Sequence, residues 1–143
     1  MGAIWRRTQP ALTYATAAHA AIGQRRKYTD QPYIVHPIRV ADIVDKFGGT
    51  DEMIMAAYLH DVVEDTAVSI ADILDMFGTD VARIVDGLTD VSVPEDGNRA
   101  VRKAIDRVHS ADASYEAQFV KCADMIDNAS DIGDNDPSFN VVY

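Results

Sequence analysis

The sequence predicts an all-α fold, a single domain of about seven helices over residues 1–143. Apolar residues recur with helical spacing through nearly the whole chain, and no segment shows convincing two-residue alternation. Hydrophobic residues make up 48% of the chain and charged residues 25%, which is typical of a globular domain rather than of a disordered chain. The length of 143 residues corresponds to about one domain.

The first predicted helix runs from Pro10, which suits a first helical turn, to about Lys27. A loop is expected over residues 28–36. Pro37 then opens a second helix, and the Phe-Gly-Gly sequence at residues 47–49 ends it.

Thr50 or Asp51 caps a third helix, which carries an apolar segment ending at Leu59. Ser69 and Asp72 form a weaker version of the capping box at the start of a fourth helix, which ends at a Phe-Gly pair. The remaining elements are predicted as helices at about 79–88, 99–108 and 113–129, with a surface loop at 91–98.

The charge of the chain excludes several classes of partner. It has 13 Lys and Arg against 23 Asp and Glu, a formal net charge of −10, which argues against a nucleic acid polymer or an anionic membrane as the main partner. No apolar run is long enough to span a membrane. The one cysteine, Cys122, excludes a disulfide framework and a multi-cysteine zinc module, and it favours a reducing, cytoplasmic location.

The segment at residues 60–66, His-Asp-Val-Val-Glu-Asp-Thr, carries the strongest chemical signal. If the third helix continues through it, His60 and Glu64 are four residues apart, as are Asp61 and Asp65, and all four share one surface. Their three carboxylates repel one another, and the apolar sequence before them indicates burial. A bound cation would resolve this conflict. The alternative for this segment alone is a helix end followed by a solvated turn.

Two residues from other segments extend this group. His36 stands just before a predicted helix start, and Asp124 lies in an otherwise apolar helical stretch. With His60 and Asp61 they form a set of two nitrogen and two oxygen ligands, which suits Mn²⁺, Fe²⁺, Co²⁺ or Zn²⁺. The lack of thiolates disfavours a structural zinc site.

The order of these motifs resembles the HD-domain metal-dependent phosphohydrolases. Within them, the chain is similar to the guanosine tetraphosphate (ppGpp) hydrolases, namely the hydrolase domain of RelA/SpoT-type enzymes and the stand-alone small alarmone hydrolases. The matching stretches are GQRRK (23–27), PYIVHP (32–37), AAYLHDVVEDT (56–66), FG (77–78), IVDGLTD (84–90) and VKCADMIDN (120–128).

The resemblance implies a helical HD-domain bundle in which the four candidate ligands hold one Mn²⁺ ion, with other divalent transition metals as alternatives. Glu64 and Asp65 would then orient and activate the attacking water. Arg26 and Lys27 would contact the guanine and the phosphates, and Asn128 would contact the nucleoside.

The function implied is Mn²⁺-dependent hydrolysis of the 3′-pyrophosphate of ppGpp to GDP and pyrophosphate. The alternatives are an NADPH 2′-phosphatase, another nucleotide phosphohydrolase, and a catalytically silent nucleotide-binding module. Each takes a small phosphorylated nucleotide as its partner. The cations Arg99, Arg102 and Lys103 are expected to form either a solvated helix face or contacts to substrate phosphates.

The sequence departs from the family pattern in two ways. Met125 and Asp127 stand where the family often has a basic residue and a His or Tyr. The sequence also ends at Tyr143, soon after the last candidate ligand, so the domain is expected to be short at its C-terminus. A homo-oligomer is one way in which such a chain could complete its pocket.

Overall fold

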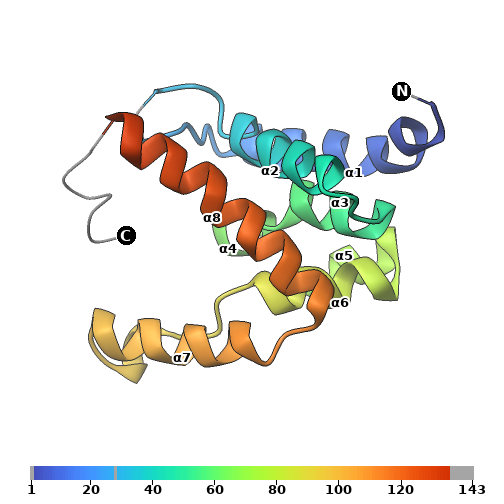
Figure 1. Cartoon of the computed structure of the whole chain (residues 1–143). Helices are drawn as coiled ribbons and strands as arrows, with labels where there is room; N and C mark the ends of the chain where they lie inside the picture. Colours follow the sequence, from blue (N-terminus) through green and yellow to red (C-terminus); the bar gives the residue numbers. More distant parts are fainter. Residues whose placement is uncertain (1, 28, 136–143) are drawn as a thin grey trace.

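The computed structural model describes residues 2–27 and 29–135. Within these ranges the chain forms eight α-helices and one 3-10 helix (Figure 1), and the only other pairing is an isolated bridge between Arg25 and Pro32. The helices are α1 (Gly2–Ala21), α2 (Val35–Lys46), α3 (Asp51–Leu59), α4 (Val62–Asp65), α5 (Ile70–Phe77), α6 (Thr79–Leu88), η1 (Pro94–Asp96), α7 (Arg99–Ala111) and α8 (Tyr115–Asn135).

Seven of these α-helices have eight or more residues, and α4 has four. The prediction of an all-α fold with about seven helices is therefore confirmed. In the ranges that the structure covers, none of the helices has the length and apolar character of a membrane span. The shortness of the domain at its C-terminus stays a prediction, and residues 136–143 lie outside the described residues.

Helix α3 lies at the centre of the bundle, where it packs against α1, α2, α6 and α8 (Figure 1). The side chain of Thr50 accepts a hydrogen bond from the backbone N–H of Met53, so the predicted cap starts this helix. Five of its nine residues are buried, because a helix surrounded by others carries apolar residues on most of its faces. The two residues that follow α3, His60 and Asp61, therefore lie inside the molecule.

The first helix differs from its prediction at both ends. It begins at Gly2, has Pro10 in its interior, and ends at Ala21 rather than near Lys27. Gly23 adopts a positive φ of 65°, and its N–H bonds back to a carbonyl of the last helical turn, which ends the helix. The sequence GQRRK therefore lies in a loop beyond α1.

The third helix does not continue through the His-Asp motif. It ends at Leu59, the chain turns at His60 and Asp61, and α4 begins at Val62. Helix α2 starts at Val35, so that His36 lies in its first turn rather than in the loop before it. These shifts of one or two residues are ordinary for helix boundaries, but the turn changes which side chains of the motif face inward.

Candidate active site

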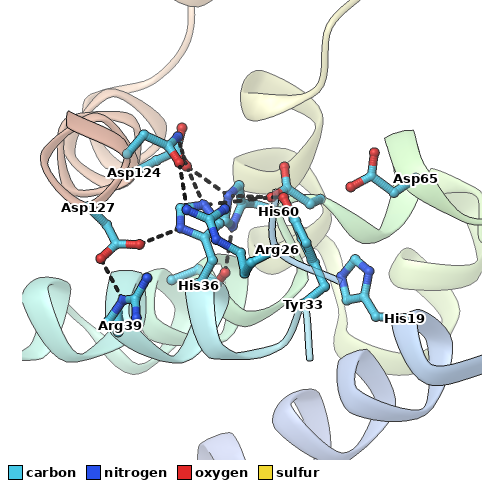
Figure 2. A network of polar contacts seen from close by, with 12 residues as sticks. His19, Arg26, Tyr33, His36, Arg39, His60, Asp65, Asp124 and Asp127 are labelled. Carbon is cyan, nitrogen blue, oxygen red and sulfur yellow. Dashed lines mark hydrogen bonds and ion pairs between the residues drawn. The ribbon is translucent and has the colours of Figure 1, made fainter. Parts of the chain in front are cut away.

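Three buried side chains from three helical segments meet beside the end of α3 (Figure 2). His36 comes from the first turn of α2, His60 follows α3, and Asp124 comes from the middle of α8. Oδ1 of Asp124 lies 2.8 Å from Nε2 of His36 and 3.2 Å from Nε2 of His60. One ligand atom from each residue lies within 4.8 Å of the other two, an arrangement that can hold a metal ion.

Asp61 adjoins this group. Its Oδ2 atom lies 3.0 Å from Nε2 of His60 and 3.8 Å from Nε2 of His36. The same oxygen accepts a 2.6 Å hydrogen bond from the hydroxyl group of Tyr33. The structure thus brings the four predicted ligands together, and their binding of a metal stays a prediction.

The charges of the group depend on one another. Although burial favours the neutral acids, the charge of His60 and a hydrogen bond from it lower the pKa of Asp61 to about 2. Hydrogen bonds from His36 and His60 hold the pKa of Asp124 far below its usual range, again against the effect of burial. The buried carboxylate of Asp124 and the half-buried carboxylate of Asp61 therefore remain ionised and require positive charge close to them.

Without a metal, the imidazole rings supply that charge. Burial disfavours both imidazolium ions, but the carboxylates outweigh it. Asp61 and Asp124 raise the pKa of His60 well above its ordinary value. Asp124 and Asp127 raise the pKa of His36. A proton on each Nε2 atom then occupies the position that a divalent cation would take, so protons and metal compete for this site.

The other ring nitrogen of each histidine has its own partner. Nδ1 of His60 donates a 2.7 Å hydrogen bond to the carbonyl oxygen of Ala57. Nδ1 of His36 lies 2.6 Å from Oδ2 of Asp127. These contacts direct both Nε2 atoms toward Asp124, as is common for histidines that bind metals.

The two predicted catalytic carboxylates lie on α4, which begins directly after Asp61. Glu64 accepts a hydrogen bond from the backbone N–H of Asp90, and Asp65 accepts a 3.0 Å hydrogen bond from the side chain of Gln24. Partial burial of the carboxyl group, with the charges of Asp90, Asp61 and Asp65, raises the pKa of Glu64 to about 7. A carboxylate with this pKa can accept a proton at neutral pH.

Glu64 also lines an open cleft of about 530 Å³ between α4 and α7. The other lining residues are Asp90, Ser92, Arg99, Arg102, Lys103 and Asp106. Within the described part of the chain, the buried Nε atom of Arg102 has no hydrogen-bond partner. Because an unpaired buried N–H group is costly, this arrangement favours an anionic ligand over a purely solvated helix face.

The predicted substrate-binding residues lie at another edge of the site. Arg26, whose side chain is 11% exposed, forms an ion pair with Asp131 and lies 3.4 Å from Oδ1 of Asn128. Nδ2 of Asn128 donates a 3.2 Å hydrogen bond to Asp124, which joins this edge to the candidate ligands. Lys27 is exposed in the same loop as Arg26.

Several residues around the site were not predicted from the sequence. The ring of Tyr33 packs against the ring of His19, with centroids 4.8 Å apart. His19 is 1% exposed and hydrogen-bonds Gln24, which in turn donates to Asp65. Tyr33 and Gln24 lie within the stretches PYIVHP and GQRRK. Their place in these family-like stretches was the sequence feature that could have identified them. Asp127 follows Asp124 by three residues and so shares its helix face.

A family model described as HD domain matches residues 11–135. The guanosine-3′,5′-bis(diphosphate) 3′-pyrophosphohydrolase MESH1 of Drosophila melanogaster is 39% identical over 130 residues, which cover 89% of this chain and 70% of that protein. MESH1 of Danio rerio is 42% identical over 120 residues, 81% of this chain and 64% of that protein.

A probable enzyme of the same name from Synechocystis is 44% identical over 82 residues, which cover 57% of this chain but only 10% of that protein. A solved structure described as a metazoan ortholog of SpoT that hydrolyzes ppGpp superimposes with a TM-score of 0.79 at 34% identity, over 91% of this chain and 72% of that one. These matches confirm the resemblance found in the sequence.

Proposed function

Because the chain belongs to the HD-domain family and is related to the SpoT and MESH1 ppGpp hydrolases, we propose that it is a Mn²⁺-dependent ppGpp 3′-pyrophosphohydrolase. The observation that carries the proposal is the convergence of His36, His60 and Asp124 beside Asp61. The similarity to the MESH1 proteins supports ppGpp as the substrate. The alternatives named above would use the same metal site, so substrate identity needs its own test.

The donor set fits a divalent transition metal. Two imidazole nitrogens and two carboxylate oxygens suit Mn²⁺ and its neighbours in the first row better than Mg²⁺ or a thiolate-bound zinc. His36, His60, Asp61 and Asp124 would hold the ion, and both Nε2 atoms would release their protons to solvent as it binds. When bound, such an ion polarises a phosphoryl oxygen and lowers the pKa of water.

The carboxylates of α4 supply the proton chemistry. In the reaction, water adds to the phosphorus attached to the 3′ oxygen, the bond between that phosphorus and the 3′ oxygen breaks, and GDP and pyrophosphate result. Glu64, with a pKa of about 7, can take the proton of the attacking water and later return it to the leaving oxygen. Gln24 holds Asp65 beside it, where Asp65 can orient the water.

The cleft between α4 and α7 supports a substrate with several phosphates. The chain as a whole is negative and repels a polyanion, so binding requires a local group of cations. Arg99, Arg102 and Lys103 form such a group in the same cleft as Glu64. Arg26, Lys27 and Asn128, at another edge of the site, would then contact the nucleoside end of the substrate.

The decisive experiment is a metal analysis of the purified protein followed by a panel of ppGpp, NADPH and nucleoside mono- to triphosphates with Mn²⁺. Release of GDP and pyrophosphate from ppGpp is the expected result. Turnover of NADPH or another nucleotide while ppGpp stays intact would reject the substrate. Tight ppGpp binding without turnover would favour the silent binding module. The cytoplasmic location and a homo-oligomeric state stay predictions, and light scattering tests the second.

A further inference from the structure

Asp127 is a buried carboxylate that the proposed reaction does not use. It lies on α8 and is 6% exposed. Its Oδ2 atom lies 2.6 Å from Nδ1 of His36, and its Oδ1 atom accepts a 2.8 Å hydrogen bond from Nε of Arg39 (Figure 2). Each oxygen therefore has a partner, and the arginine compensates the negative charge. A carboxylate buried with this degree of pairing has a defined orientation.

The contact with Asp127 determines where His36 carries its proton. A carboxylate accepts hydrogen bonds and does not donate them, so Nδ1 of His36 must hold a proton. Nε2 lies 2.8 Å from the carboxylate of Asp124, so in the metal-free protein it also holds a proton. A cation that displaces this proton can bind the Nε2 lone pair, while Asp127 keeps the other proton on Nδ1. A flipped ring would place a carbon atom against the carboxylate and lose the hydrogen bond.

The two histidines are held by different kinds of group. The partner of Nδ1 in His60 is the neutral carbonyl oxygen of Ala57, three residues earlier in the same segment. The partner of Nδ1 in His36 is charged and comes from α8, the helix that also carries Asp124. A carboxylate that accepts the hydrogen bond of Nδ1 raises the basicity of Nε2 more than a neutral carbonyl oxygen does. Nε2 of such a histidine therefore binds a metal more strongly.

Building on the metal site of the proposed function, we infer that Asp127 is a positioning residue for His36 and that Arg39 holds its carboxylate in place. Asp127 fixes the ring orientation and the protonated nitrogen of His36, and it strengthens Nε2 as a metal ligand. Loss of such a partner costs about 10–100-fold in metal affinity. Asp127, where the sequence departs from the family pattern, thus contributes to the site by positioning His36.

A purely structural role would have a different signature. Arg39 also bonds Asp131, with 3.1 and 3.2 Å between its Nη2 atom and the two carboxylate oxygens. Asp131 is one turn further along α8 than Asp127, and it also forms an ion pair with Arg26. If Asp127 serves only to join α8 to α2, loss of either carboxylate should have the same effect. Asp131 is therefore the matched control.

The test uses Asp127→Asn and Asp131→Asn in the full chain. Asparagine keeps the shape of aspartate, but one of its two terminal groups is an NH₂ donor, so it cannot accept from His36 and Arg39 together. Calorimetric titration of Mn²⁺ without substrate should show Asp127→Asn weakened about 10–100-fold and Asp131→Asn within about twofold of wild type. Thermal unfolding of the metal-free variants tests whether both are folded. Equal affinity of Asp127→Asn and wild type, or equal losses in both variants, would overturn the inference.

A second measurement needs no variant. In wild-type protein loaded with diamagnetic Zn²⁺, nitrogen NMR of the histidine rings should show His36 with its proton on Nδ1 and none on Nε2. A proton on Nε2 of His36 would overturn the inference even if Asp127→Asn does not fold. Wild-type protein that binds no divalent metal would contradict the proposed function and this inference with it. Wild-type protein that binds metal, with Asp127→Asn unaffected, would contradict this inference alone.

Discussion

The hydroxyl group of Tyr33 donates a 2.6 Å hydrogen bond to Oδ2 of Asp61, the same oxygen that lies 3.0 Å from Nε2 of His60. The ring of Tyr33 packs between those of His19 and His36, at centroid distances of 4.8 and 6.0 Å. The loop before α2 therefore reaches a candidate metal ligand on the segment after α3. Tyr33 fixes the orientation of Asp61 in the way that Asp127 is inferred to fix His36.

Tyr33→Phe removes this hydrogen bond and keeps the ring packing. Because a hydrogen bond to a charged group contributes about 1.5–3 kcal/mol and Tyr33 is half-buried, the metal-free variant should lose about 1–2 kcal/mol of unfolding free energy. Mn²⁺ affinity should also fall, because Asp61 is freer to rotate. Urea unfolding and metal titration measure the two effects. Tyr58→Phe, which removes the hydroxyl group of a half-buried tyrosine on α3, is the control. Equal losses in both variants would contradict a specific role for Tyr33.

Asp61→Ala should lose metal and activity together. It removes one of four candidate ligands and leaves a cavity where a carboxylate balanced two imidazoles. Metal content by elemental analysis and kcat on ppGpp are measured on the same preparation. A variant that retained full metal occupancy and full rate would show that Asp61 is not a ligand.

The metal-free protein should lose stability as the solution becomes alkaline. The pKa values of His36 and His60 are raised in the folded state by Asp124 and its neighbouring carboxylates, against the effect of burial. A raised pKa means that the stabilisation is fully present below the unfolded value of about 6.5 and is lost as pH rises through the folded value. Asp61 behaves in the opposite sense, since its pKa of about 2 gives stabilisation that is lost as pH falls toward that value.

The metal-free protein should therefore be most stable between about pH 4 and 6.5. With Mn²⁺ bound, the cation replaces the imidazole protons, so the alkaline loss should disappear, and metal affinity should rise with pH. Urea unfolding at several pH values, with chelator or with excess Mn²⁺, measures both curves. Parallel curves with and without metal would show that the metal binds somewhere other than at these histidines.

Arg102→Gln tests the cleft as the phosphate site. Since the buried Nε atom of Arg102 lacks a partner in the described residues, removal of the guanidinium should cost little stability and should raise KM for ppGpp by about 10-fold or more. Mn²⁺ affinity should not change. Arg107→Gln, an exposed arginine on the same helix outside that cleft, is the control. The same KM in both variants would indicate that the cations of α7 form a solvated helix face and do not bind phosphate.

The sequence predicted the candidate metal ligands better than it predicted the residues that hold those ligands in place. Helical periodicity and the caps at Thr50 and Ser69 were sufficient to predict the all-α class and the approximate number of helices, because both are local properties. The candidate ligands were recognisable because histidines and acids stand in a specific order in otherwise apolar segments. The end of α1 was predicted too late in the chain. Gly23 lies within a helical sequence pattern, and it ends the helix through a positive φ that the neighbouring residues do not indicate.

Asp127 shows what a sequence alone cannot provide. The chain has 19 aspartates, and most of them cap helices or face solvent. Which one contacts a candidate ligand depends on how α8 is rotated against α2, and that rotation is set by packing across the interface rather than by local sequence. Arg39, three residues after His36, lies on the same face of α2 and meets Asp127 for the same reason.

Glu64→Gln separates binding from chemistry. Glutamine keeps nearly the same shape but cannot take a proton, while His36, His60 and their carboxylate partners are untouched, so metal binding should survive. Substrate affinity should hold or improve, because one negative charge beside the phosphates is gone. The rate should fall by about 10²–10⁴, the usual contribution of a positioned acid–base group.

The pH profile of the same variant supplies the second readout. Because Glu64 has a pKa of about 7 and must be ionised to accept a proton, kcat/KM of the wild-type protein should decline as pH falls below about 7, and Glu64→Gln should lack that step. Metal content is measured alongside kcat. Loss of metal in Glu64→Gln would indicate that Glu64 binds the metal or positions one of its ligands. An unchanged rate and profile would leave Asp65, held by Gln24, as the remaining candidate base.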